Sequence, residues 1–312
     1  MVSTYLVQDL DARQGDNPHT ILTFINARER LKSAPVWASE RHRIQNVLRG
    51  HVVEVTGIIG QYRDRRQLQV EAIRPVPPDE VDWSELHPSI GDPAPWWHLI
   101  DTWRAGIRGP RLARTLALLF DDPAFRRRFE QCPASLSGHH ARLGGLLQHT
   151  CEVAQLVLAI AAVRPEADRD LALAGALLHD IGKLEAYTWE GLFDTTVGGR
   201  VIGHTVLGAR MLDRVGSAAR SCHPEELDAL HHLILSHHGR LEFGAPVLPL
   251  SLEAEILSHA DLVSARTSSL AEALASESLF RPGDQFSSTS LWELEHRRIW
   301  RGRSDWGYAP QT

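Results

Sequence analysis

A histidine and an aspartate stand side by side at the end of an apolar helical run, as His179 and Asp180. Together they offer a divalent metal two ligands at once. The periodic stretch 168–181 predicts a helix, and Gly182 is expected to stop it. Lys183 follows as a compact positive charge suited to a phosphate oxygen. A chain that uses this pair must bring further ligands to it, which constrains how the rest of the chain folds.

Lysine is rare in this chain, and that makes Lys183 informative. Of the 33 basic residues, only Lys32 and Lys183 are lysines. The bias suggests that arginine has replaced lysine wherever charge alone was needed. A crowded site in which one ammonium must reach one oxygen does not tolerate that replacement. We therefore favour a chemical role for Lys183 over an accidental position.

Further ligands lie on other predicted helices. Apolar periodicity predicts helices over 96–103, 110–120, 123–129, 145–163, 168–181, 204–215, 225–236 and 252–274. The histidines and aspartates that we select as metal ligands are His149, His179, Asp180, His204, His237, His238 and Asp261. Ligands from separate helices are typical of a site inside a helical bundle. The sequence therefore predicts an all-α domain with a metal centre in its interior.

The selected ligands are enough for two ions. His149, His179, Asp180 and Asp261 would hold one, and the other three histidines a second, with Asp180 as a bridge. Imidazoles with carboxylates suit Mn²⁺, Fe²⁺, Co²⁺, Ni²⁺ or Zn²⁺, while the lack of nearby cysteine disfavours a structural zinc site. We expect two ions, with Mn²⁺ as the first choice and Mg²⁺ as a further candidate. Such a pair activates a water and neutralises a phosphoryl centre.

The first 78 residues have a different pattern. Alternating or β-branched runs predict strands over 5–7, 20–25, 52–59 and 67–73. Four or five short strands favour a small barrel, for which the OB-fold is the natural candidate. Residues 1–78 contain 11 basic and 8 acidic residues, and the rest of the chain contains 22 and 31. This charge asymmetry fits a nucleic-acid-binding domain attached to a metal enzyme, and it also fits two domains with ordinary surfaces.

Candidate nucleic-acid contacts lie in this basic segment. Arg63, Arg65 and Arg66 on a hairpin would bind backbone phosphates, and Tyr62 would stack a base. The further stacking candidates are Phe24 and Trp37. The alternative for the hairpin is a solvated charged turn that binds nothing.

The fold class expected from these patterns is α+β and multidomain. An OB-like barrel over 1–78 is followed by a proline-rich linker over 79–95, a helical domain over 96–275 and a tail over 276–312. No membrane-spanning run and no signal segment are expected, which favours a cytoplasmic protein. A homo-oligomer stays open.

The ligand pattern resembles that of the HD-domain metal-dependent phosphohydrolase superfamily. The short sequence motifs around these ligands are similar to those of one branch, the YhaM-type 3′→5′ exoribonucleases, which couple an N-terminal OB-fold to the HD domain. The similar stretches are 139–150, with its three histidines and two glycines, Gly203-His204, Ser236-His237-His238-Gly239 and 253–261. The resemblance is specific over 139–266 and loose in the first 80 residues.

The resemblance implies roles for individual residues. His149, His179, Asp180 and Asp261 would share one metal, and His204 with His237 or His238 would hold a second. Lys183 would contact the scissile phosphate, and His140 would act on the substrate side. The implied activity is the 3′→5′ hydrolysis of single-stranded RNA, with DNA as a further substrate, to nucleoside monophosphates. The alternatives are a phosphohydrolase of free nucleotides or cyclic dinucleotides, and a nucleic-acid-binding protein without catalysis.

Overall fold

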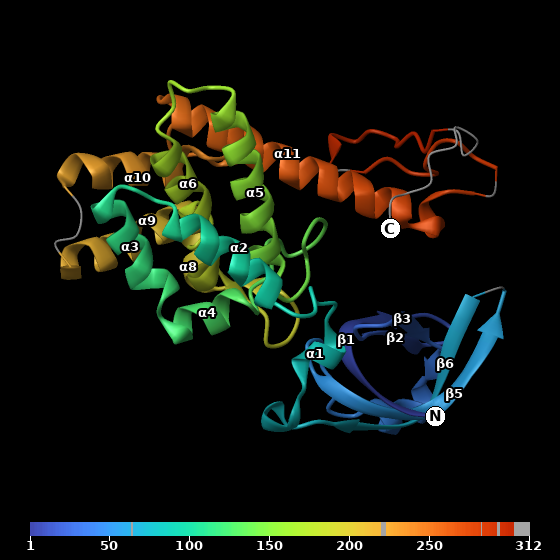
Figure 1. Cartoon of the computed structure of the whole chain (residues 1–312). Coiled ribbons are helices and arrows are strands. Elements are labelled where there is room, and N and C mark those ends of the chain that lie inside the picture. Colours follow the sequence, from blue (N-terminus) through green and yellow to red (C-terminus); the bar gives the residue numbers. More distant parts are fainter. Residues whose placement is uncertain (64, 220–222, 282, 292–293, 303–312) are drawn as a thin grey trace.

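A small β-barrel precedes a larger helical bundle in this protein (Figure 1). The computed structural model describes residues 1–63, 65–219, 223–281, 283–291 and 294–302. The predicted architecture, an OB-like barrel followed by a helical domain, is confirmed. A last segment after α11 (Leu252–Ala275) folds back beside the end of that helix, where Phe280, Leu294 and Ile299 pack against Ala273.

The barrel closes by pairing its first two strands. The strands are β1 (Val2–Arg13), β2 (His19–Ile25), β3 (Arg30–Ser33), β4 (Val36–Trp37), β5 (Val52–Tyr62) and β6 (Arg65–Pro75). Within the described residues their order is β1-β5-β6-β3-β2-β4, and the additional β1–β2 pairing closes five of them into a barrel. A 3-10 helix, η1 (Ala38–Ile44), follows β4. The strands β3 and β4 were not predicted, because runs of four and two residues leave no readable alternation.

Alternation of the side chains fills the barrel. Val53 and Val55 on β5 point inward with Leu68 and Val70 on β6, and all four are buried. The register of these two strands shifts at Gly57, where a Cβ would lie 2.2 Å from the carbonyl oxygen of Gln69. Glycine is therefore required for the strands to come this close.

The helical part is built around α5 (Gly145–Ala162), which packs against α6 (Arg169–Leu178) and α11 (Figure 1). The other helices are α2 (Ala94–Ala105), α3 (Pro110–Phe120), α4 (Pro123–Phe129), α7 (Lys183–Ala186), α8 (Val197–Val201), α9 (His204–Ala219), α10 (Pro224–Ser236) and the 3-10 helices η3 (Leu241–Phe243) and η4 (Glu277–Leu279). Contrary to the sequence expectation, α5 is long and apolar enough to cross a membrane. Its burial among the other helices explains that composition as a core helix.

The segment between barrel and bundle contains η2 (Pro78–Glu80) and α1 (Trp83–Leu86). It meets the hairpin of β7 (Tyr187–Thr188) and β8 (Asp194–Thr195). The His87 ring stacks on Phe193 with centroids 4.3 Å apart, and its Nε2 lies 2.7 Å from the carbonyl oxygen of Gly191. Leu192 packs with Leu86 in a cluster that includes barrel residues. The barrel is thus attached to the loop that separates Lys183 from His204.

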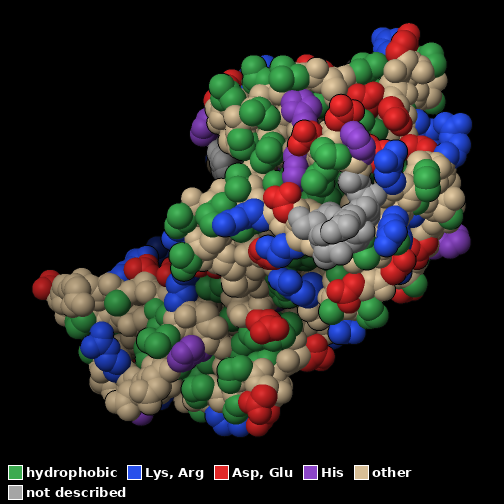
Figure 2. Space-filling model, turned by 90° about the vertical axis from the view of Figure 1, so that its left-hand side faces the viewer, with side chains coloured by type: hydrophobic (Ala, Val, Ile, Leu, Met, Phe, Trp, Pro, Cys, Tyr) green, Lys and Arg blue, Asp and Glu red, His purple; other side chains and the backbone are tan. Residues whose placement is uncertain are grey.

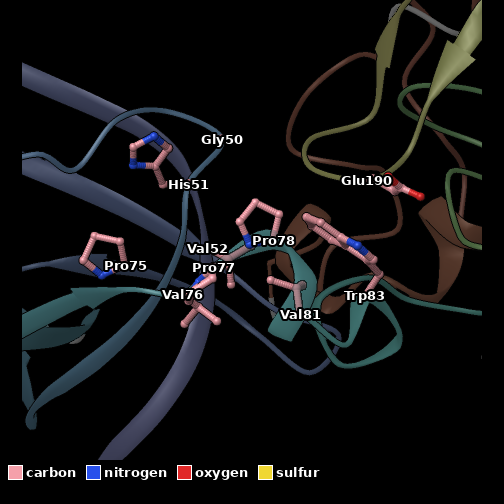
Figure 3. A pocket seen from close by; sticks show the side chains of 10 residues that line it. All are labelled: Gly50, His51, Val52, Pro75, Val76, Pro77, Pro78, Val81, Trp83 and Glu190. Carbon is pink, nitrogen blue, oxygen red and sulfur yellow. The ribbon is translucent and has the colours of Figure 1, made fainter.

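A pocket of about 490 Å³ lies beside this junction. Figure 3 shows its apolar wall of prolines and valines, with the Trp83 ring on the side nearer Glu190. Its lining comes from the turn that leads into β5, the end of β6, the linker and the β7–β8 loop. None of the predicted metal ligands lines it.

Candidate metal centre

The selected ligands converge from five helices at the centre of the bundle. His149 lies in the first turns of α5, His179 and Asp180 directly follow α6, and His204 opens α9. His237 and His238 follow α10, and Asp261 lies in the middle of α11. Most of these side chains are buried, and those of His204, His238 and Asp261 reach the surface in part.

The ligand atoms form two groups. His149, His179 and Asp261 offer atoms that all lie within 4.8 Å of one another, and so do His204, His237 and His238. In the first group, His149 Nε2 is 3.3 Å from His179 Nε2 and 3.1 Å from Asp261 Oδ1. In the second, His238 Nε2 is 3.1 Å from His204 Nε2. Either group has the donor set that a divalent transition metal prefers.

Asp180 lies between the two groups and faces each with a different oxygen. Its Oδ2 is 3.5 Å from His149 Nε2 and 3.3 Å from His179 Nε2. Its Oδ1 is 3.4 Å from His204 Nε2 and 3.6 Å from His237 Nε2. A carboxylate in this position has the geometry of a bridging ligand.

Close backbone packing brings the two groups together. A Cβ on Gly182 would lie 1.9 Å from the carbonyl oxygen of His204 and 2.4 Å from the backbone nitrogen of Gly208. Only glycine lets the turn after Asp180 touch the first turn of α9 in this way. The expectation that Gly182 stops the helix was wrong, since α6 already ends at Leu178 and Gly182 has right-handed φ and ψ of −65° and −16°. The role of Gly182 is to let the turn after Asp180 come close to the backbone of α9.

Two buried polar atoms at this centre fit a metal. Among the described residues, Asp180 Oδ1 and His237 Nε2 are buried and have no hydrogen-bond partner. Such atoms cost free energy unless a partner satisfies them, and a cation between them would do so. The residues present therefore fit one or two divalent ions.

The electrostatics keep most of the ligands in the forms that bind metal. Burial lowers the pKa of His204 to about 3, and burial likewise lowers the pKa values of His149 and His237, so these imidazoles are neutral at pH 7. Burial alone would raise the pKa of Asp180, but Lys183 and His179 hold it well below its usual range. The carboxylate is therefore ionised, and the imidazole lone pairs of His149, His204 and His237 are free. His179 differs: burial would lower its pKa, but Asp180 and Asp261 raise it above the usual histidine value, so a metal bound there would displace a proton.

Lys183 and His140 take different positions beside the ligands. The Lys183 ammonium forms a buried ion pair with Asp180 Oδ2. His140 is buried next to His149, with ring centroids 5.5 Å apart, and its Nε2 lies 3.1 Å from Glu152 Oε1. A substrate contact by either residue stays a prediction.

Glu152 and Ser264 were missed by the sequence reasoning. Ser264 Oγ lies 3.1 Å from His149 Nδ1 and 2.8 Å from Glu152 Oε2. The available signal was spacing, since Glu152 follows His149 by three residues and Ser264 follows Asp261 by three, which puts each pair on one helix face.

The barrel aromatics predicted to stack on nucleic-acid bases differ in their exposure to solvent. Phe24 was wrong as a stacking candidate, because its ring is fully buried in the barrel core against Tyr5, with centroids 5.6 Å apart. Trp37 is 44% exposed and lies 5.1 Å from the His19 ring. Tyr62 is 57% exposed at the end of β5.

Three arginines surround the tip of the β5–β6 hairpin. The Arg63 guanidinium lies 5.3 Å from the centroid of the Tyr62 ring. Arg66 Nη1 lies 3.3 Å from Glu29 Oε2. The side chain of Arg65 is outside the part of the structure that is described. On the face of the molecule in Figure 2, basic and acidic side chains are intermingled, with no single-sign field.

Comparison with known proteins agrees with this geometry. Residues 146–266 match the family model of the HD domain. The chain is 32% identical to the 3'-5' exoribonuclease YhaM of Bacillus subtilis over 256 residues, which cover 80% of the chain and 78% of the relative. It is 30% identical to YhaM of Bacillus pumilus over 277 residues, covering 86% and 83%. YhaM of Halalkalibacterium halodurans is 29% identical over 279 residues, covering 87% and 85%.

No solved structure matches the chain. The relatives nevertheless extend from barrel to bundle, since each aligns with four fifths of the chain or more. The HD match covers α6, α9 and α10 completely and the ligand-bearing parts of α5 and α11. The chain belongs to the YhaM family of HD-domain hydrolases.

Proposed function

We propose that this protein is a metal-dependent 3′→5′ exoribonuclease that shortens single-stranded RNA, and also DNA, to nucleoside monophosphates. The observation that carries the proposal is the pair of ligand groups on either side of Asp180, inside a chain related over most of its length to named exoribonucleases. A pair of divalent ions held there would supply an activated water and neutralise charge on the phosphoryl group. Mn²⁺ as the metal, two as its number and the cytoplasm as its location are parts of this proposal.

The chain's own residues have defined tasks in this reaction. The imidazoles of both groups and the ionised Asp180 and Asp261 would hold the ions. Lys183 carries its positive charge beside Asp180 and would place it against the scissile phosphate. The barrel, attached next to the loop between Lys183 and His204, would hold the single strand upstream of its 3′ end.

The first experiment is incubation of the purified protein with Mn²⁺ and an end-labelled single-stranded RNA. We expect a ladder that shortens from the 3′ end and disappears when a chelator removes the metal. The His179→Ala/Asp180→Ala double variant, which lacks ligands from both groups, is expected to give no ladder. An intact oligomer, with turnover of free nucleotides or cyclic dinucleotides instead, would overturn the nuclease assignment. RNA binding without any turnover would favour a non-catalytic binding protein.

The β5–β6 hairpin is the part of the barrel that we expect to bind RNA. The double variant Arg63→Ala/Arg66→Ala should weaken RNA binding roughly 10-fold, because two phosphate contacts are lost. The slope of log Kd against log salt should fall by about 1.4 if each arginine neutralises one phosphate of a single strand. The rate at saturating RNA should not change, since neither residue is among the metal ligands.

A matched control lies on the same strand. Arg74 is exposed at the far end of β6 and pairs with Glu54, its Nε 3.4 Å from Glu54 Oε1. Arg74→Ala should leave both affinity and salt slope unchanged. Equal effects of the two variants, or none in either, would sink the hairpin as the interface. Filter binding of labelled RNA at several salt concentrations measures both quantities.

A further inference from the structure

Glu152 is the focus of a hydrogen-bond cluster that touches the metal centre without belonging to it. It lies on α5 one turn after His149, and its carboxylate accepts hydrogen bonds at both oxygens. The donors are Gln148 Nε2 at 2.9 Å, His140 Nε2 at 3.1 Å, Ser264 Oγ at 2.8 Å and Ser268 Oγ at 3.3 Å. Burial alone would raise the pKa of Glu152, yet His140, Ser264 and Gln148 lower it to about 2. The group is therefore a fixed acceptor at pH 7.

Ser264 links Glu152 to His149 and thereby determines which nitrogen of the His149 ring carries the proton. Because a carboxylate only accepts, the Ser264 hydroxyl must donate its one proton to Glu152 Oε2. The lone pairs of Ser264 Oγ then face His149 Nδ1 at 3.1 Å, so that Nδ1 must carry the proton. The other nitrogen, Nε2, keeps its lone pair and points at His179 and Asp261. This is the tautomer that a metal requires.

His149 needs such help because of its place in the fold. His179 and His237 each lie just after a helix, and their Nδ1 atoms reach the carbonyl oxygens of Ala176 at 2.8 Å and Ile234 at 2.7 Å. Carbonyls of a last helical turn lack intrahelical partners and are free to accept. His149 lies inside α5, where the backbone carbonyls are engaged in the helix. Its orienting acceptor must come from a side chain, and α11 supplies Ser264.

We propose that Glu152, acting through Ser264, is the positioning residue of His149 and sets the affinity of the first ligand group for a divalent cation. His140 belongs to the same cluster, since it is buried and its Nε2 contacts Glu152 Oε1, which leaves Oε2 to face the serines of α11. The inference rests on the metal centre of the proposed function. It assigns Glu152 to the orientation of a ligand and gives it no contact with RNA.

The test compares two serines on α11, one turn apart. Both donate to Glu152 Oε2, but of these two serines Ser264 is the one whose hydroxyl contacts the ring of His149. Ser264→Ala should weaken Mn²⁺ binding to the metal-free protein roughly 10- to 100-fold, the usual loss when the orienting partner of a histidine ligand is removed. Ser268→Ala should stay within about twofold of wild type, because the chain from Glu152 to His149 is intact. Calorimetric titration with Mn²⁺ alone measures both.

A second readout separates orientation from general damage. The Mn²⁺ concentration that half-saturates RNA hydrolysis should rise in Ser264→Ala by the same factor, whereas the rate at saturating Mn²⁺ should approach that of wild type. The melting temperature in chelator should equal that of Ser268→Ala. The double variant Glu152→Gln/Ser264→Asp, which moves the carboxylate one link nearer to His149, should restore Mn²⁺ affinity. Rescue by a displaced carboxylate is not expected if the serine only packs.

The outcomes distinguish this inference from the proposed function. Equal Mn²⁺ affinity of Ser264→Ala and Ser268→Ala would overturn the positioning role. A wild type that binds Mn²⁺ without cleaving RNA, with Ser264→Ala weakened, would support the positioning role while overturning the nuclease. A wild type that binds no divalent ion would overturn both.

Discussion

Replacing Asp180 with asparagine is expected to lower the rate of RNA hydrolysis on the order of 10³-fold, the scale of losing a principal electrostatic group of an active site. The reason is geometric, since one carboxylate faces both ligand groups, through Oδ2 on one side and Oδ1 on the other. An amide keeps the shape but presents a neutral oxygen and an N–H, so neither group retains its shared anion. Metal analysis should find both ions lost from Asp180→Asn. By contrast, His204→Ala should lose only the second ion.

A carboxylate of the same kind elsewhere provides the control. Asp213 also pairs with a histidine, its Oδ1 3.1 Å from His231 Nε2, but it lies on the exposed side of α9. Asp213→Asn should retain full activity and both ions. In Asp180→Asn, Lys183 loses its buried partner, which could unfold the protein. Circular dichroism must therefore first show that this variant is folded. A folded Asp180→Asn variant that still cleaves RNA at the wild-type rate would refute the bridging role.

The convergence of the predicted ligands could be anticipated from the sequence because several of them stand at the ends of apolar helical runs. His179 and Asp180 end one run, and His204 begins another. What periodicity does not contain is the register between helices far apart in the chain. The contact of Glu152 with Ser264 spans 112 residues and depends on how α5 lies against α11. Such a pairing is a property of the packed bundle.

Two errors have similarly specific causes. Phe24 alternates with Leu22 on β2, and this period of two already predicted one buried face. Phe24 was selected for stacking because it is aromatic. Closure of the barrel, however, buries the face of β2 that carries Leu22 and Phe24 in the core. Gly182 was interpreted from local signals as a helix stop. Glycine is required there because the backbone of His204, 22 residues later, leaves no room for a Cβ. In both cases a tertiary contact outweighed a local pattern.

Replacing Lys183 with methionine is expected to lower kcat on the order of 10²-fold while the protein keeps its metal. Burial opposes the charge of this ammonium, but Asp180 raises its pKa above the ordinary lysine value, so it stays protonated. Methionine fills a similar volume without the charge, and removal of a cation beside Asp180 should leave Mn²⁺ affinity unchanged or tighter. Activity is thus lost without loss of metal, which is the opposite of the pattern expected for Asp180→Asn.

Arginine in the same position tests why a chain with 31 arginines keeps a lysine here. Lys183 is only 8% exposed and begins α7, which packs against α9, so the longer planar guanidinium has no room to occupy the place of the ammonium. Lys183→Arg should therefore be impaired like Lys183→Met, although its charge is retained. The control is the other lysine, Lys32, which is exposed on β3, and Lys32→Met should leave kcat at saturating RNA unchanged. If Lys183→Arg turned over RNA at the wild-type rate, charge alone would suffice, and the compact ammonium would have no special role.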